Sequence, residues 1–181
     1  MAFFKETEIV GLYQFQINPR FQDERGSFSK PFHVTFLEEH GIKFECKESF
    51  LTFSHQNVLR GLHFQSPPHA HDKIVSCFAG SVFDVVVDLR KSSKTYGSVL
   101  SFELNENNNE ALLIPVGCAH GFKVLSKAGA WMAYYTTKEH AQASDHGVLW
   151  SSFSVDWPGG VSIVSPRDAK FPDWKDVGFF L

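Results

Sequence analysis

The nine residues from Ser81 to Leu89 read SVFDVVVDL and form the clearest strand pattern in the chain. Valine and phenylalanine fit a pleated, largely buried surface, and Gly80 in front of them marks a turn. Residues 99–104 have the same character and end at the polar stretch 105–109, which is typical of a loop. Two neighbouring strands of this kind predict a β-rich interior.

Further short strand patterns lie on both sides of this pair and are separated by turn residues. We expect strands over residues 11–17, 27–32, 111–114, 121–125, 130–137 and 162–164. A turn is expected at 23–26. Short helices are expected at 36–40, which Gly41 closes, and near 173–177. Many short strands between turns predict an all-β sandwich or barrel with short terminal helices, formed by residues 1–181 as a single domain.

The composition excludes several classes of function. A chain of 181 residues with 43% hydrophobic side chains fits one well-packed domain. The formal net charge of −3 leaves no basic excess for a nucleic-acid backbone, so no nucleic-acid partner is expected. No apolar run approaches the roughly 18 residues of a membrane span, and the charged N-terminus lacks a signal-peptide core. Three widely spaced cysteines, Cys46, Cys77 and Cys118, indicate reduced thiols and a cytoplasmic location.

Histidines gather in the segment RGLHFQSPPHAHDK, residues 60–73. The later segment IPVGCAHGF, residues 114–122, contains Pro-x-Gly-x-x-His, whose tight turn directs His120 inward. His69, His71 and His120 could together bind a metal. The carboxylate that commonly completes such a site a few residues further on is missing, because residues 74–77 are all uncharged, so the main hypothesis uses neither metal nor organic cofactor. A metal-dependent enzyme remains an alternative.

Taken together, these motifs resemble the dTDP-4-dehydrorhamnose 3,5-epimerase family of the cupin superfamily. The matching motifs are RGLHFQ at 60–65, PPHA at 67–70 with Lys73, GSVFDV through DLR at 80–90, IP through AHGF at 114–122, GVLW at 147–150 and DWP at 156–158. They follow the family's order and nearly its spacing over about residues 21–168. The resemblance implies a jelly-roll cupin fold and a homodimer. It also implies a deoxysugar-biosynthesis isomerase that inverts carbon 3, carbon 5 or both in a nucleotide-diphosphate 4-keto-6-deoxy sugar.

Inversion beside a ketone needs a base, a group that stabilises the enolate oxygen and an acid on the opposite face. The resemblance assigns the base to His63, with Asp168 as the carboxylate that fixes its tautomer. It assigns enolate stabilisation to Lys73 and the acid to Tyr134. Neighbouring strand residues face opposite sides, so only one of Tyr134 and Tyr135 can point inward. Without the resemblance, Asp168 would be interpreted as a turn or helix-cap residue and Lys73 as a solvated surface lysine.

Two further polar residues complete the interior set that the resemblance implies. Asp84 lies within the clearest strand, where a buried carboxylate is costly unless it is paired. We expect it to bond His120 or Lys73. Asp84 and His120 then act either in catalysis or as a structural hydrogen-bonded pair.

The substrate's diphosphate and base need their own binding residues. Arg25 and Arg60 lie in matching motifs, and arginine can hold phosphate oxygens in a fork. Phe21 and Phe28 are candidates for packing against the base or sugar, and ordinary core packing is the alternative for both.

The chain departs from the family pattern at several binding positions. Glu48 and Phe50 stand where the family usually has a glutamine and an asparagine that contact nucleotide and sugar. His140 stands where it has a second tyrosine, and Ser76 where an arginine is common. These changes suggest another nucleotide, CDP or GDP, another sugar, or inversion at a single carbon.

Overall fold

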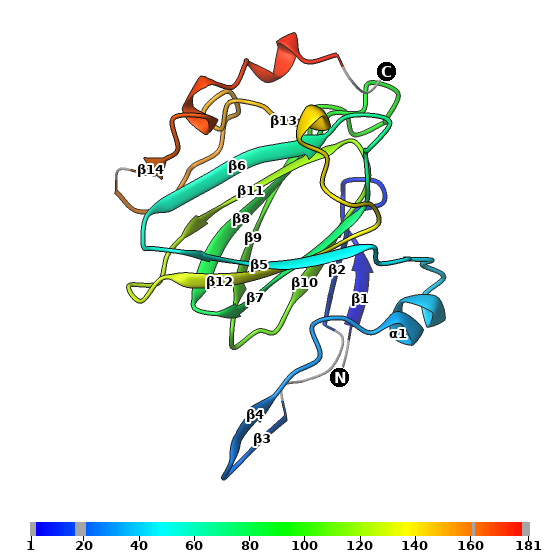
Figure 1. The fold of residues 1–181 in the computed structure, drawn as a ribbon, viewed down its shortest axis with the longest axis vertical. Coiled ribbons are helices and arrows are strands. Elements are labelled where there is room, and N and C mark those ends of the chain that lie inside the picture. The colour runs from blue at the N-terminus through cyan, green and yellow to red at the C-terminus, as the bar shows by residue number, and fades with distance from the viewer. Residues whose placement is uncertain (1–2, 17–20, 161, 179–181) are drawn as a thin grey trace.

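Two antiparallel β-sheets face each other in a sandwich (Figure 1). The computed structural model describes residues 3–16, 21–160 and 162–178. In spatial order, the first sheet contains β1 (Phe3–Glu6), β2 (Tyr13–Gln16), β10 (Ala111–Ile114), β7 (Lys73–Ala79), β12 (Ala130–Thr136) and β5 (Glu48–Ser54). The second contains β13 (Asp145–Gly147), β6 (Val58–Gln65), β11 (Cys118–Val124), β8 (Ser81–Asp88) and β9 (Val99–Asn105), with β14 (Ile163–Val164) parallel to β6. The expected all-β sandwich is therefore confirmed.

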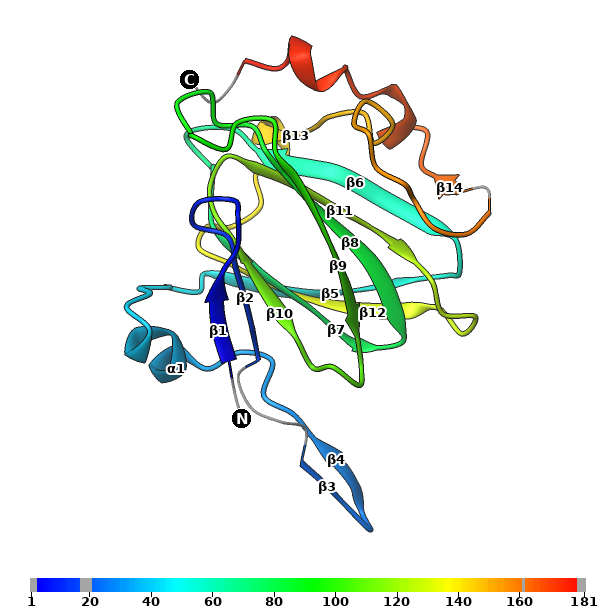
Figure 2. The same ribbon diagram turned by 180° about the vertical axis from the view of Figure 1, so that it is seen from behind.

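The remaining elements are short. A hairpin of β3 (Phe21–Asp23) and β4 (Gly26–Phe28) extends away from both sheets (Figures 1 and 2). One α-helix, α1 (Val34–Glu39), begins two residues before the expected helix and ends ahead of Gly41. The 3₁₀ turns are η1 (Gln142–Ser144), η2 (Asp168–Lys170) and η3 (Trp174–Asp176). No helix in the described ranges is long and apolar enough to cross a membrane.

Some expected boundaries were wrong. The strand expected at 27–32 ends at Phe28, and the chain then runs across the outside of the first sheet towards α1. The strand expected at 11–17 is β2, and residue 17 lies outside the described residues. The helix expected near 173–177 is the single turn η3, where the Asp173 side chain accepts a hydrogen bond from the backbone N–H of Lys175.

Three strands that the sequence did not predict, β5, β6 and β7, form a large part of the wall of the pocket described below. Several inward positions of β5 and β6, and Lys73 at the start of β7, hold polar or charged side chains where a core strand would hold apolar ones. In β6 these are Arg60, His63 and Gln65. The simple alternation of apolar and polar residues is therefore lost.

The clearest strand, β8, is buried on both faces, which explains its continuous apolar run. Val82 and Val86 belong to the core between the two sheets. Val85 and Val87 belong to a second core, which the C-terminal segment covers on the outer side of the second sheet. This segment, orange to red in Figure 1, lies along β6. It brings residues that are far from β6 in the sequence next to the second sheet.

Candidate active site

A pocket of about 240 Å³ opens between the two sheets. The first sheet contributes β5, β7 and β12, and the second contributes β6, β11 and β13. Alternate residues of β5, Glu48, Phe50 and Thr52, face the pocket because strand side chains alternate between faces. Seven of the residues predicted from the sequence line it: His63, Lys73, Tyr134, His120, Arg60, Glu48 and His140.

His63 on β6 is paired with Asp168 on η2. Its Nε2 lies 3.0 Å from Asp168 Oδ1, and Asp168 Oδ2 accepts the backbone N–H of Gly61 at 3.1 Å. Burial acts to raise the pKa of Asp168, but the hydrogen bonds from His63 and Gly61 outweigh it and the pKa is lowered. An ionised carboxylate only accepts hydrogen bonds, so Nε2 carries the proton and Nδ1 is left basic.

Lys73 on β7 reaches the same region. Its Nζ donates a hydrogen bond to the backbone oxygen of His63 at 3.3 Å. Burial lowers the pKa of Lys73 to about 8, although nearby Asp84 favours the charged form. A partly desolvated ammonium of this kind can stabilise a developing negative charge.

Tyr134 and Tyr135 on β12 point in opposite directions. Tyr134 is 9% exposed and lines the pocket, and its ring stacks on Phe50 with centroids 4.6 Å apart and an interplanar angle of 8°. Tyr135 packs outside the sandwich against Phe32, at 5.0 Å. Burial raises the pKa of Tyr134, so its hydroxyl keeps its proton near neutral pH.

His120 and Asp84 form a second histidine–carboxylate pair beneath the pocket. His120 Nε2 lies 2.8 Å from Asp84 Oδ2, and the two residues are 4% and 0% exposed. The expected pairing of Asp84 is therefore observed. Within the described structure Asp84 Oδ1 has no hydrogen-bond partner. Burial raises the pKa of Asp84 and lowers that of His120, and their mutual attraction opposes both shifts.

One end of the pocket is bounded by Arg60. Its Nε donates to Ser54 Oγ at 2.8 Å and its Nη2 to the backbone oxygen of Phe53 at 3.4 Å. These bonds tie β6 to β5 across the two sheets and hold the guanidinium at the pocket wall. A cation fixed there suits a phosphate group.

A cluster of charged groups bounds the opposite end. Glu48 Oε2 accepts the backbone N–H of His140 at 2.8 Å. Asp145 Oδ2 lies 2.7 Å from Arg167 Nη2 and 3.4 Å from His140 Nε2. The sequence analysis missed Asp145 and Arg167, and the only signal was that Arg167 directly precedes Asp168.

Three residues predicted to bind substrate lie outside this pocket. Phe21 and Phe28 on the protruding hairpin are 58% and 60% exposed. Arg25 at the hairpin tip pairs with Asp23 at 2.6 Å, and its side chain is 80% exposed. The structure of a single chain therefore does not bring these residues to the site.

The histidines of the metal alternative do not converge. His69 Nδ1 lies 3.0 Å from Ser144 Oγ, and His71 Nδ1 lies 3.1 Å from the backbone oxygen of His69. Among the described residues, no group of three or more histidine, cysteine, aspartate or glutamate side chains is placed to hold a metal ion.

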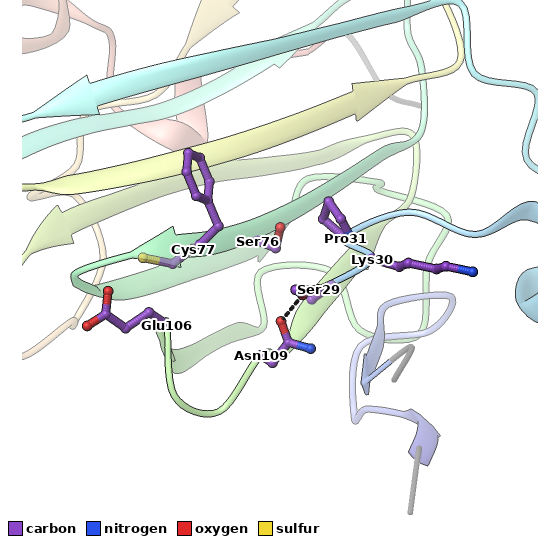
Figure 3. Close-up of a pocket in the computed structure, with 9 residues that line it drawn as sticks. Ser29, Lys30, Pro31, Ser76, Cys77, Glu106 and Asn109 are labelled. Carbon is purple, nitrogen blue, oxygen red and sulfur yellow. Dashed lines mark hydrogen bonds between the residues drawn. The ribbon is translucent and has the colours of Figure 1, made fainter. Parts of the chain in front are cut away.

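A second cavity, of about 180 Å³, lies on the outer side of the first sheet (Figure 3). It is bounded by residues 29–31, by β7 and by the loop before β10. Ser29 Oγ donates to Asn109 Oδ1 at 2.6 Å across it. It contains none of the predicted catalytic residues.

The pocket between the sheets has the components of an acid–base enzyme. A histidine oriented by a carboxylate and a buried tyrosine come from opposite sheets, with a lysine beside them. Together with the cupin-like sandwich, this arrangement defines the class as enzymes that move protons by acid–base catalysis.

Comparison with known proteins identifies the family. The model of the dTDP-4-dehydrorhamnose 3,5-epimerase family matches residues 6–176. The dTDP-4-dehydrorhamnose 3,5-epimerase of Shigella flexneri is 38% identical, over 97% of this chain and 98% of its own. The dTDP-4-dehydrorhamnose 3-epimerase of Streptomyces niveus is also 38% identical, over 81% of this chain and 72% of its own.

A solved structure agrees with these matches. The dTDP-6-deoxy-D-glucose-3,5-epimerase of Legionella pneumophila, in complex with dTDP-4-keto-L-rhamnose, superimposes with a TM-score of 0.92 at 35% identity, over 98% of this chain and 95% of that one. The chain belongs to the dTDP-4-dehydrorhamnose 3,5-epimerase family and is an isomerase.

Proposed function

We propose that this enzyme inverts carbon 3 and carbon 5 of a dTDP-linked 4-keto-6-deoxy sugar. The observation that carries the proposal is the placement of His63 and Tyr134 on opposite walls of one pocket, with the Lys73 side chain reaching from β7 to the backbone of His63. The names of the relatives from Shigella and Legionella support this substrate.

Each inversion follows from the chemistry of these three side chains. His63 Nδ1 removes the proton from the carbon next to the ketone, and the electron pair moves onto the ketone oxygen. The Lys73 ammonium stabilises that enolate oxygen. Tyr134 then delivers its hydroxyl proton to the opposite face of the carbon, so the configuration is inverted. The ketone at carbon 4 activates both neighbours, which allows one site to act twice.

The test is solvent exchange in deuterium oxide, followed by NMR of the sugar protons. With dTDP-4-keto-6-deoxyglucose we expect deuterium at both carbons and inversion at both. A Tyr134→Phe variant should still remove the carbon proton but should invert poorly, because His63 is intact and the opposite acid is lost. Absence of exchange with the folded wild-type enzyme would contradict the proposal.

Inversion at a single carbon is the second candidate. Glu48, Phe50 and His140, which depart from the family pattern, lie together along one wall of the pocket. The relative from Streptomyces niveus is named a 3-epimerase. The same experiment separates the two candidates, since a single epimerase would incorporate deuterium at one carbon. Parallel samples with CDP- and GDP-linked sugars test the nucleotide.

We also propose that the active form is a homodimer in which the hairpin of β3 and β4 reaches the partner's pocket. The outer face of the first sheet carries four exposed large apolar side chains, Leu51, Phe53, Phe78 and Trp131. The cavity of Figure 3 opens beside them, and its buried Ser76 Oγ has no hydrogen-bond partner in the described structure. A second copy seated on this face would cover both features. It would also give Phe21, Arg25 and Phe28 a binding role.

Two further expectations remain predictions. The first is a cytoplasmic location. The second is a role in making deoxysugars for polysaccharides.

A further inference from the structure

The proposed reaction creates a proton imbalance inside the pocket, and the following inference rests on that proposed function. After one inversion His63 holds an extra proton, and Tyr134 has lost one. The second inversion needs a neutral His63 and a protonated Tyr134 again. One proton must therefore move from His63 to Tyr134 while the sugar is still bound.

Solvent is poorly placed to carry this proton. Tyr134 is only 9% exposed even in the empty pocket, and its Phe50 neighbour is stacked on it. A sugar bound between His63 and Tyr134 would cover the hydroxyl of Tyr134 further. The groups that restore Tyr134 must therefore lie inside the protein.

His120 is a buried titratable group that neighbours both partners. It pairs with His63 in register on neighbouring strands β11 and β6, which places the two side chains about 5 Å apart at Cβ. Its ring centroid lies 6.3 Å from that of Tyr134 in an edge-on arrangement. It therefore bridges the wall that holds the base and the wall that holds the acid.

We propose that His120, held by Asp84, is a proton relay that resets the site between the two inversions. One proton moves from His63 to Nδ1 of His120, and a proton moves from that nitrogen to the phenolate oxygen of Tyr134. No bond other than N–H and O–H changes, and no other reactant is needed. Asp84 keeps its hydrogen bond to Nε2 and stabilises the transient imidazolium.

The surroundings of His120 favour transient rather than lasting protonation. The charged or titratable groups that face it are Asp84 on β8, His63 on β6, Lys73 on β7 and Tyr134 on β12. Burial and the Lys73 and His63 charges lower the pKa of His120, whereas Asp84 opposes this shift. Burial raises the pKa of Tyr134, so transfer from His120 to the phenolate is downhill.

The test separates the first inversion from the later ones. His120→Gln and Asp84→Asn are mixed in deuterium oxide with dTDP-4-keto-6-deoxyglucose at near-stoichiometric enzyme and quenched at short times. We expect the first deuterium per site to enter within about twofold of the wild-type rate, and later ones to slow by roughly 10- to 100-fold. His55→Asn, which changes an exposed histidine outside the pocket, is the matched control and should match the wild type.

Equal slowing of both phases would overturn the relay and assign His120 a direct or structural role. The wild type gives a second, independent measurement in case the variants do not fold. If the relay passes the abstracted proton from His63 to Tyr134 inside the site, some of the protium taken from the first carbon should appear at the second inverted carbon of the sugar. Complete deuteration of both carbons in the first turnover would also overturn the relay. Absence of any exchange in the wild type would instead reject the proposed function.

Discussion

At the scale of single residues, the site depends on how each ionisable side chain is paired. Asp168 receives hydrogen bonds from His63 and from the backbone of Gly61, so its carboxylate stays ionised although it is 4% exposed. Asp84 has a histidine partner at one oxygen only. The same residue type therefore orients a base in one place and supports a buried relay in the other.

Replacing Asp168 with asparagine tests the orientation of the base. Asparagine keeps the size of the side chain but loses the charge, so it no longer fixes Nε2 as the protonated nitrogen. We expect kcat to fall by roughly 10²- to 10⁴-fold with a small change in melting temperature. Asp173→Asn, at the cap of η3, is the control and should retain activity. A variant of Asp168 with wild-type kcat would show that His63 does not need the carboxylate.

Deprotonation of Lys73 should set the fall of kcat at alkaline pH. Burial favours the uncharged amine and lowers the pKa of Lys73 to about 8. The ammonium that stabilises the enolate is thus present below this pH and is lost above it, so kcat should fall as pH rises through about 8. Lys73→Arg should be slower but should lose this limb, because a guanidinium does not titrate there. An unchanged limb in that variant would assign the titration to another group.

At the scale of the elements, the close contact between β6 and β11 sets the positions of both histidines. Gly61 and Gly121 face each other where the register shifts after the His63–His120 pair. A Cβ on Gly121 would lie 2.5 Å from the backbone oxygen of Arg60 and 3.0 Å from Cα of Gly61. The two strands can therefore approach this closely only without side chains.

Gly121→Ala should push these strands apart. We expect a loss of about 1–3 kcal/mol in the free energy of unfolding, measured by urea denaturation, together with reduced kcat from the displaced histidines. Gly160→Ala, where the added Cβ meets no atom within 4 Å, should change neither quantity. Equal stability of the two variants would mean that the strands adjust without cost.

At the scale of the whole molecule, the hairpin of β3 and β4 decides whether one chain is sufficient. Arg25→Ala and His63→Asn variants are each expected to be weakly active. If the hairpin serves the partner's pocket, a remixed heterodimer contains one complete site. Activity should then recover to about a quarter of the wild-type value, because half of the dimers are mixed and each has one good site of two. If the hairpin serves its own chain, mixing restores nothing.

Much of the fold could be predicted from local patterns. Strand β8 was identified because it is apolar on both faces, and α1 because a short helical run ends at Gly41. Strands β5 and β6 were missed because most of their inward residues are polar residues of the pocket, and β7 begins at another of these, Lys73. Strand prediction from local periodicity depends on apolar residues that face a core. It fails where those positions hold the polar residues of an active site.

The sequence by itself determined the all-β class and, through its motifs, the family and the candidates His63, Lys73, Tyr134 and Asp168. Only the tertiary structure decided that Tyr134 faces inward and Tyr135 outward, and that Arg25 lies away from the pocket of its own chain. It also added Asp145 and Arg167 to the pocket wall. The physical reason is that residue types and their order are properties of the sequence, so motifs can be recognised before the chain folds. The direction of a side chain and its distant partners exist only once two sheets and the C-terminal segment have packed together.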